Sequence, residues 1–308
     1  MVAFLRLTRW PNLVIIALVQ YLMRFSLIEY LEIPHVLNHF EFFLGVLCSI
    51  SLAAGGYIIN DLNDLEADAI NKPARISIGK GISENTAWSL YLIFTAIALG
   101  CGYWLGQVVA LPNLGYIPVL AALLLYLYAL DLKKRAVIGN LLVALLTGLP
   151  VFLVGVFDVL PAAELGNAAQ VKSAFEVITA YSLFAFWINL MRELAKDAQD
   201  TKGDAAQGYR TLAVLLGPKN QRLIIFALAL VLFIFTAYFN WGLYPGDPLS
   251  TAYVALFVNA PLLFFIVKST RARRSDDFRR LSNLLKIIML TGILSMVIFS
   301  VSIELQRL

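Results

Sequence analysis

Residues 40–68 read FEFFLGVLCSISLAAGGYIINDLNDLEAD. The stretch is mainly apolar up to residue 59, and four of its last eight residues are acidic. About 20 apolar residues are the length that an α-helix needs to cross the hydrocarbon core of a bilayer. The stretch therefore predicts a membrane-spanning helix whose polar end carries a cluster of carboxylates.

The same apolar pattern recurs along the whole chain. Of its 308 residues, 60% are hydrophobic and 14% are charged, whereas soluble domains have about 45–50% apolar and about 25% charged residues. We expect an all-α integral membrane bundle of nine transmembrane helices in a single domain over residues 1–308, with no disulfide between its two cysteines. The predicted spans are 12–33, 40–59, 87–107, 114–130, 138–158, 174–194, 221–241, 250–267 and 284–305.

The basic residues sort sharply between the two sides that nine spans create. The N-terminus and the loops on its side carry 21 of the 24 Lys and Arg residues. Because cytoplasmic loops are enriched in Lys and Arg, we expect a multi-pass protein of the inner (cytoplasmic) membrane, with its N-terminus in the cytoplasm and its C-terminus outside. The net charge of +4 reflects these loops, and no basic-aromatic pattern predicts nucleic-acid binding.

Two cytoplasmic segments share the pattern D-x-x-D-x-x-x-D, and six of the eleven aspartates lie in them. On a helix, residues three and seven apart lie on one face. Each segment therefore predicts a column of three carboxylates, and such like charges need a cation between them. Oxygen ligands favour Mg²⁺, which bridges carboxylates and phosphate oxygens. The two columns are Asp61, Asp64 and Asp68, and Asp197, Asp200 and Asp204.

Basic residues flank both columns, and a third basic cluster lies between the fourth and fifth predicted spans. Such side chains bind phosphate oxygens that a metal leaves free. Together these features predict a ligand with a phosphate head at the cytoplasmic mouth and an apolar tail among the spans. The basic residues are Lys72, Arg75, Lys133, Lys134, Arg135, Arg192, Lys196 and Arg210.

Other classes of protein fit these observations less well. A single acidic cluster at a helix end is typical of a solvated face, but two clusters of identical spacing are not. An ion-coupled transporter should carry its carboxylates near the midplane of the membrane. A CDP-alcohol phosphotransferase would carry an Asp-Gly-x-x-Ala-Arg run, which is absent from the sequence. The hydropathy excludes a soluble prenyl synthase.

The two acidic segments also resemble the motifs of a known family, the UbiA superfamily of intramembrane prenyltransferases. Asn60-Asp61-x-x-Asp64-x-x-x-Asp68, followed by Asn71-Lys72-Pro73 and Arg75, resembles the first motif of this family. The second motif is similar to the run from Arg192 to Asp204, continued by Gly208 and Arg210-Thr211-Leu212. The likeness extends to Arg9-Trp10-Pro11-Asn12 at the first span.

This resemblance implies a nine-helix bundle with a central cavity and cytoplasmic cap loops, and Mg²⁺-dependent prenyl transfer. It implies two or more Mg²⁺ ions that bridge the carboxylates and a diphosphate. Metal contacts are implied at Asn60, Asp64, Asp68, Asp200 and Asp204, with Asp61 and Asp197 assisting. The catalytic residues among these are Asp64, Asp68, Asp200 and Asp204, and the expected diphosphate contacts are Lys72, Arg75, Lys133, Lys196, Arg210, Arg9 and Asn12.

The partners implied are a polyprenyl diphosphate donor, a lipophilic acceptor and membrane lipid. The overall likeness favours a geranylgeranyl donor and geranylgeranylglyceryl phosphate as the acceptor. An aromatic quinone precursor, such as 4-hydroxybenzoate or dihydroxynaphthoate, is the alternative. The sequence reveals no catalytic base and does not fix the length of the donor.

Overall fold

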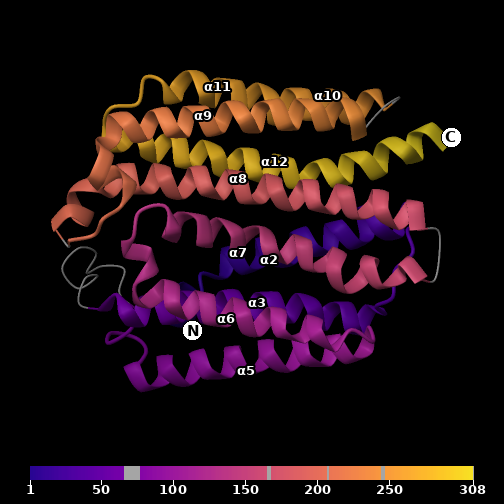
Figure 1. Cartoon of the computed structure of the whole chain (residues 1–308), viewed down its shortest axis with the longest axis horizontal. Helices are drawn as coiled ribbons and strands as arrows, with labels where there is room; N and C mark the ends of the chain where they lie inside the picture. The colour runs from indigo at the N-terminus through magenta and orange to yellow at the C-terminus, as the bar shows by residue number, and fades with distance from the viewer. Residues whose placement is uncertain (66–76, 165–167, 207, 244–246, 308) are drawn as a thin grey trace. The chain divides into compact units, whose positions relative to one another are not determined.

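The computed structural model of the protein describes residues 1–65, 77–164, 168–206, 208–243 and 247–307. Within these ranges the chain forms helices and no named strand, and nine helices are long and apolar enough to cross a membrane (Figure 1). The predicted all-α membrane fold is confirmed. The nine candidate spans are Trp10–Ile28, His39–Asn63, Glu84–Val108, Pro112–Leu130, Ile138–Ala163, Ala168–Ala206, Leu212–Gly242, Pro248–Ser269 and Ser275–Gln306.

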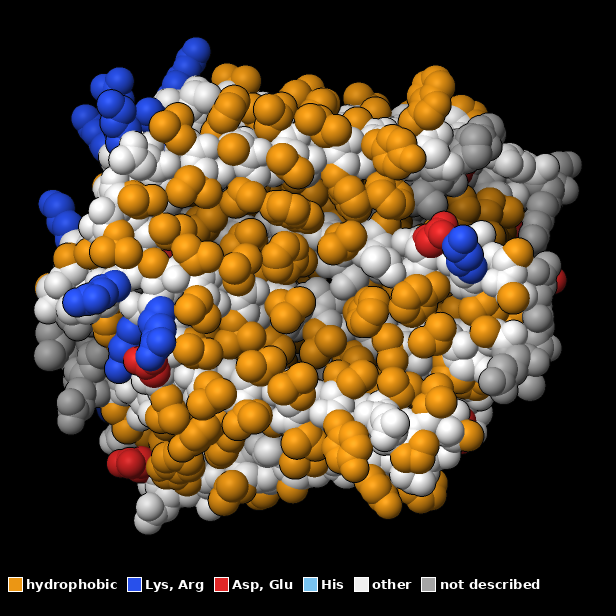
Figure 2. All heavy atoms as spheres, in the orientation of Figure 1, with side chains coloured by type: hydrophobic (Ala, Val, Ile, Leu, Met, Phe, Trp, Pro, Cys, Tyr) orange, Lys and Arg blue, Asp and Glu red, His pale blue; other side chains and the backbone are white. Residues whose placement is uncertain are grey.

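The described chain divides into two compact units of helices. One unit comprises residues 1–21, 34–133 and 153–172, and the other comprises residues 22–33, 134–152 and 173–308. We call them unit 1 and unit 2. On the face shown in Figure 2, hydrophobic side chains cover the lengths of the helices and most Lys and Arg side chains lie near helix ends. This pattern is expected of helices that lie in lipid.

Unit 1 contains the first part of the first predicted span, the second to fourth spans and the end of the fifth. Helix α3 packs against α5 and α6. It begins with a capping box, in which Asn38 accepts hydrogen bonds from the backbone of Phe40 and Glu41 while Glu41 accepts one from Asn38. The helices of unit 1 are α1 (Val2–Leu7), α2 (Trp10–Leu22), α3 (His39–Asn63), α5 (Glu84–Val108), η2 (Pro112–Gly115), α6 (Tyr116–Leu130), η4 (Gly155–Val159) and η5 (Leu160–Glu164), with η3 (Leu132–Lys134) at its boundary.

Unit 2 contains the remaining helices. Helix α11 packs against α9 and α12, and α10 packs against α12. The last helices are joined in part by side-chain hydrogen bonds, since Tyr253 donates to the carbonyl oxygen of Thr291 over 3.0 Å. The helices of unit 2 are η1 (Met23–Glu29), α7 (Ile138–Val154), α8 (Ala168–Ala206), α9 (Leu212–Leu243), α10 (Pro248–Val254), η6 (Ala255–Asn259), α11 (Ala260–Ser269) and α12 (Ser275–Arg307), of which α7 and α8 extend slightly into unit 1.

Two sequence predictions need correction. The first span was predicted to reach residue 33, but α2 continues as the π-helix η1 and ends at Glu29. The first acidic segment was predicted to be a helical column, but α3 ends at Asn63 and Asp64 is its C-cap, with φ −102° and ψ 6°. The Asn63 side chain donates to the carbonyl oxygen of Ile59 over 2.8 Å, a bond within the last turn of the helix. Both cysteines are free, as expected.

Candidate active site

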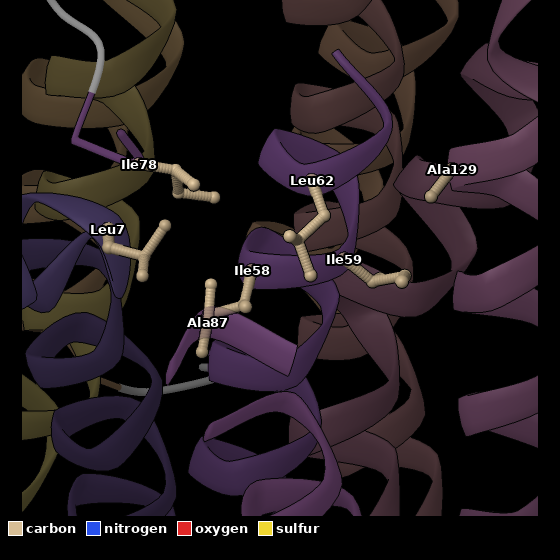
Figure 3. Packing of buried hydrophobic residues seen from close by; sticks show 7 residues of the cluster. All are labelled: Leu7, Ile58, Ile59, Leu62, Ile78, Ala87 and Ala129. Carbon is tan, nitrogen blue, oxygen red and sulfur yellow. The ribbon is translucent and has the colours of Figure 1, made fainter. Parts of the chain in front are cut away.

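In unit 1, the polar end of α3 rests on an apolar cluster. Ile58, Ile59 and Leu62 of α3 are buried against residues of four other segments (Figure 3). This packing fixes the last turns of the helix, because a buried aliphatic side chain stabilises its position by about 1.5–3 kcal/mol. The polar residues between these positions are thereby held at a defined place. The remaining members of the cluster are Leu7, Ile78, Ala87 and Ala129.

Arg9 holds one side of this helix end. Its Nη2 atom lies 2.9 Å from Oδ1 of Asp61, and its guanidinium carbon lies 4.7 Å from the ring centre of Tyr57. Asn12 donates a hydrogen bond of 3.1 Å to the hydroxyl of the same tyrosine. The backbone of Arg9 has φ +50°, a left-handed conformation that is uncommon outside glycine. Such strain concentrates at functional sites.

Lys133 holds the other side. Its Nζ atom lies 2.6 Å from Oδ1 of Asp64 and 3.2 Å from Oδ1 of Asn60, and the Asn60 amide donates to Oδ2 of Asp64 over 3.1 Å. The side chains of Lys133 and Asp64 are only 8% and 20% exposed. Removing one partner of such a poorly solvated pair is costly. Two cations thus neutralise the carboxylates at the end of α3.

In unit 2, the second acidic segment lies on one continuous helix. Asp197, Asp200 and Asp204 all belong to α8, which runs on to Ala206. The predicted helical column is therefore present here. The side-chain amide of Asn140, near the start of α7, donates to Oδ2 of Asp197 over 2.9 Å. Asp200 has a long contact of 3.5 Å with the amide of Gln199.

The chain after α8 turns back beside the third basic cluster. Gly208 has φ +72° and lies just beyond the helix, where a left-handed glycine commonly ends an α-helix. The backbone N–H of Arg210 then donates to the carbonyl oxygen of Lys134 over 2.9 Å. The hydroxyl of Thr211 donates to Oδ2 of Asp204 over 3.3 Å. These contacts bring Arg210 and the Lys134–Arg135 backbone together.

The structure thus assembles the predicted residues into two groups, one in each unit. In unit 1, Arg9, Asn12 and Lys133 lie with Asn60, Asp61 and Asp64. In unit 2, Arg210 follows the three acids of α8, while Lys196 pairs with Glu193 over 2.5 Å. Asp68, Lys72 and Arg75 lie outside the described residues.

Three contributors were not named as site residues from the sequence, although Thr211 lies in the second motif. Tyr57, Asn140 and Thr211 each bind a predicted site residue from another element or turn. The available signal was weak: Tyr57 lies one helical turn before Asn60, and Asn140 is a polar residue at the start of an apolar span. Neither position belongs to a spacing motif.

Carboxylate and amide oxygens that can bind a metal ion lie beside Lys and Arg side chains at the helix ends, and apolar helices surround them. In the described parts of the chain, no group of three His, Cys, Asp or Glu residues is close enough to form a metal site alone. Within unit 1, Asn60, Asp61 and Asp64 would therefore share a cation with other oxygen ligands. A ligand with its own phosphate oxygens would supply them.

A model of the UbiA prenyltransferase family matches residues 11–290. The chain belongs to the UbiA prenyltransferase family. It is therefore a multi-pass membrane prenyltransferase, and the family resemblance of its two acidic segments is confirmed. Digeranylgeranylglyceryl phosphate synthase of Methanosphaera stadtmanae is 32% identical over 267 residues, which cover 85% of this chain and 89% of that protein.

Solved structures of UbiA proteins share the fold. A structure from work on digeranylgeranylglyceryl phosphate synthase in membranes is 24% identical, with a TM-score of 0.72 over 97% of this chain and 98% of that chain. A UbiA homologue from Archaeoglobus fulgidus, bound to GPP and Mg²⁺, is 15% identical, with a TM-score of 0.55 over 96% of this chain and 99% of that chain.

Proposed function

We propose that this prenyltransferase moves a geranylgeranyl group from its diphosphate to geranylgeranylglyceryl phosphate, with Mg²⁺ as the cofactor. The observation that carries the proposal is the polar network at the end of α3, in which Arg9 and Lys133 contact the carboxylates of Asp61 and Asp64. The acceptor is inferred from similarity to digeranylgeranylglyceryl phosphate synthases. The donor head group is inferred from the homologue that binds GPP and Mg²⁺.

The chemistry of the donor set fits magnesium. Asn60, Asp61 and Asp64 present amide and carboxylate oxygens within five residues, and all three side chains already lie beside a cation. Hard oxygen ligands of this kind suit Mg²⁺. We propose that these residues hold Mg²⁺ together with Asp68, and that Asp197, Asp200 and Asp204 hold Mg²⁺ in unit 2, with two or more ions in all. Bound magnesium would stabilise the charge that develops on the diphosphate.

The residues of the chain have separate tasks in the proposed reaction. In unit 1, Lys133 and Arg9 would exchange carboxylate contacts for phosphate oxygens, with Asn12, Lys72 and Arg75 as further phosphate contacts. In unit 2, Lys196 and Arg210 would contact phosphate oxygens. Arg9 can bind two oxygens at once, whereas Lys133 acts as a point charge. These cations stabilise the leaving diphosphate as the allylic carbon–oxygen bond breaks. The acceptor hydroxyl then forms the new carbon–oxygen bond and gives its proton to the released diphosphate.

The surroundings protect the reaction. An allylic carbon becomes cationic when diphosphate leaves, and water would capture it. The apolar helices around the polar residues exclude water from the prenyl chain. We propose that residues 1–308 act as one domain in the inner membrane, with this site at the cytoplasmic face.

The decisive experiment is transfer by the purified protein in nanodiscs with geranylgeranyl diphosphate and Mg²⁺. The acceptors are geranylgeranylglyceryl phosphate, 4-hydroxybenzoate and dihydroxynaphthoate. We expect product with the glyceryl phosphate alone. EDTA should abolish product formation because it removes the metal. Asp64→Asn and Asp200→Asn should each abolish it because each removes the charge of a proposed metal ligand.

Asp276→Asn is the matched control, since Asp276 is an exposed acid in the first turn of α12. It should leave turnover unchanged. A prenylated aromatic product would move the assignment to quinone precursors. Normal turnover by Asp64→Asn or Asp200→Asn would refute the proposed metal site.

A further inference from the structure

The loop between α11 and α12, together with the first turns of α12, forms a strongly basic surface of unit 2. Residues 268–286 contain seven Lys and Arg residues, all of them exposed, and two acids, Asp276 and Asp277, which leaves a net charge of +5. Figure 2 shows Lys and Arg side chains gathered at the end of α11 that leads into this loop. The seven cations of this basic surface are Lys268, Arg271, Arg273, Arg274, Arg279, Arg280 and Lys286.

The cations of the basic surface differ from those of the candidate site in their partners. In the part of the chain that the structure describes, none of the seven forms an ion pair, whereas Arg9, Lys133 and Lys196 each lie within 2.9 Å of a carboxylate oxygen. Like charges that are held together without counter-charges repel one another. The bias of charge between the two sides of the membrane accounts for the side on which these residues lie. It does not account for their missing partners, which an anionic ligand would supply.

Hydrogen bonds hold the loop of the basic surface in a defined shape. Nη1 of Arg222 on α9 donates to the carbonyl oxygen of Ala272 over 3.1 Å. Oδ2 of Asp277 accepts from the backbone N–H groups of Arg273 and Arg274, each over 3.0 Å. Because the bonds to Asp277 use only backbone groups of the two arginines, both guanidinium groups stay available to a ligand.

The exposed surface changes from apolar to basic at one residue on each helix. On α11, Val267 is 53% exposed and Lys268 follows it; on α12, Ile287 is 57% exposed and Lys286 precedes it. Arg279 lies about 10 Å beyond Lys286 along α12. The polar headgroup layer is about 5–8 Å thick on each side of the hydrocarbon core. The seven cations therefore lie in the headgroup layer and at its aqueous edge.

The basic surface is separate from the acidic column of α8. Oγ of Ser275, at the start of α12, donates to the carbonyl oxygen of Gln199 on α8 over 3.0 Å. At 100° per residue, Gln199 lies about 100–160° around the helix from the three acids of the column. Helix α12 therefore meets α8 on a different face from the one that carries the carboxylates. The seven cations thus lie apart from the proposed metal ligands of unit 2.

We propose that the basic surface binds the phosphate groups of anionic phospholipids in the leaflet that surrounds it. Phosphate oxygens supply the missing counter-charge, and Arg can bind two of them at once. Clusters of about four to eight Lys and Arg beside a membrane span are typical of such lipid binding. The flanking spans keep the loop at the depth of the headgroups, which favours a lipid over a free anion. The proposal holds whichever acceptor the enzyme prenylates.

Native mass spectrometry of the purified full-length protein tests the proposal. The protein is titrated in detergent with phosphatidylglycerol, which is anionic, or with phosphatidylcholine, which carries its own ammonium group. We expect phosphatidylglycerol to bind about tenfold more tightly or better. The triple variant Arg273→Gln, Arg279→Gln, Arg280→Gln should lose at least this preference, because each cation near the membrane surface contributes about fivefold. Its affinity for phosphatidylcholine should be unchanged.

A second triple variant removes the same charge elsewhere. Arg6→Gln, Lys80→Gln, Lys134→Gln replaces three exposed cations on the same predicted side of the membrane. It should bind phosphatidylglycerol within about twofold of the parent protein, since these positions lie outside the basic surface. Equal losses of affinity in the two triple variants would overturn the proposal, because net charge alone would then explain binding.

Lysine modification tests the proposal on the unsubstituted chain, even if the first triple variant fails to fold. The protein in nanodiscs is treated with a lysine-reactive ester, and mass spectrometry measures the modified fraction at each lysine. Phosphatidylglycerol should slow modification of Lys268 and Lys286 relative to phosphatidylcholine, and Lys80 serves as the reference in the same sample. Equal slowing at all three lysines would overturn the proposal. Equal slowing by millimolar inorganic phosphate in phosphatidylcholine nanodiscs would also overturn it, because the ligand would then be a free anion.

Discussion

At the scale of single residues, Lys133 is the residue on which the site in unit 1 depends most. It contacts both Asp64 and Asn60 and is almost fully buried. Lys133→Met should lower turnover about 100- to 1,000-fold, because a cation that stabilises developing charge is removed. Steady-state kinetics at saturating Mg²⁺ measure the effect.

Lys134→Met provides the control for this prediction. Lys134 is exposed and contributes its backbone oxygen to Arg210, which the substitution leaves in place. Its turnover should stay within about twofold, since exposed charges contribute little. Equal losses of turnover in the two variants would show that the overall positive charge of the loop matters and that the specific contacts of Lys133 do not.

Asn140 provides the second prediction at this scale. Asn140→Leu leaves the Asp197 carboxylate without its amide donor, which costs about 1–3 kcal/mol. Turnover at a fixed, low Mg²⁺ concentration should fall about 5- to 150-fold. Most of this loss should come from an increase in the Mg²⁺ concentration that gives the half-maximal rate. Asn220→Leu is the control, because Asn220 is exposed and donates only to the nearby carbonyl oxygen of Leu216. A Mg²⁺ dependence unchanged from the parent protein would exclude a positioning role for Asn140.

The residues show what the sequence could predict. Asn60, Asp61 and Asp64 follow from a spacing motif after an apolar span, so they could be named without coordinates. Their partnership with Arg9 and Lys133 could be suspected from family likeness. The contacts of Asn140 and Tyr57 could not, because each joins positions at least 45 residues apart in the chain. Such contacts are fixed by tertiary packing.

At the scale of elements, the two acidic segments have the same spacing but different backbones. Helix α3 stops at Asn63, whereas α8 carries all three of its acids and ends only before Gly208. At the end of α3, the Asn63 side chain binds a carbonyl oxygen of its own helix. After α8, Gly208 allows the left-handed turn that follows the helix. The spacing alone could not distinguish these two endings.

The approach of α7 to α8 leads to a third prediction. A Cβ atom at Gly148 would lie 2.8 Å from the carbonyl oxygen of Ser182, an atom that cannot move without its helix. Gly148→Ala should therefore destabilise the protein by about 1–3 kcal/mol. Because α7 also carries Asn140, turnover should fall as well. Thermal unfolding in detergent and the transfer assay measure the two effects.

Gly100→Ala is the matched substitution. Gly100 is an exposed residue within α5, and a Cβ atom there would have no neighbour within 4 Å. Replacing glycine by alanine inside a helix then stabilises by roughly 0.5–1 kcal/mol. The two variants should thus shift the melting temperature in opposite directions. A shared direction would mean that helix propensity outweighs the close approach of α7 and α8.

At the scale of the whole molecule, hydropathy located all nine spans but not the full lengths of their helices. The sixth span was predicted to end at residue 194, whereas α8 continues to Ala206. A helix of 39 residues is about 58 Å long, roughly twice the thickness of the bilayer core. The polar extension escapes a search for apolar residues, although it carries the second acidic segment.

The orientation of the molecule in the membrane is the last prediction. Of the 24 Lys and Arg residues, 21 lie on the side of the N-terminus when nine spans are assumed. Such a bias directs a loop to the cytoplasm during insertion. The acidic segments lie on the same side, so the diphosphate should be bound from the cytoplasm. The C-terminus and the loop around Leu111 should face the opposite side.

Single cysteines test this orientation in a variant that lacks Cys48 and Cys101. Lys80→Cys lies in an exposed turn and Lys219→Cys at an exposed position of α9, both on the basic side, and Leu111→Cys lies in an exposed loop on the other. A membrane-impermeant maleimide should label the first two in inverted vesicles and the third in right-side-out vesicles. Labelling of Lys80→Cys and Leu111→Cys from the same side would mean that the helix between them, Glu84–Val108, does not cross the membrane. Complete reversal of all three would preserve the nine spans but place the diphosphate site outside, where the basic loops would contradict the charge rule.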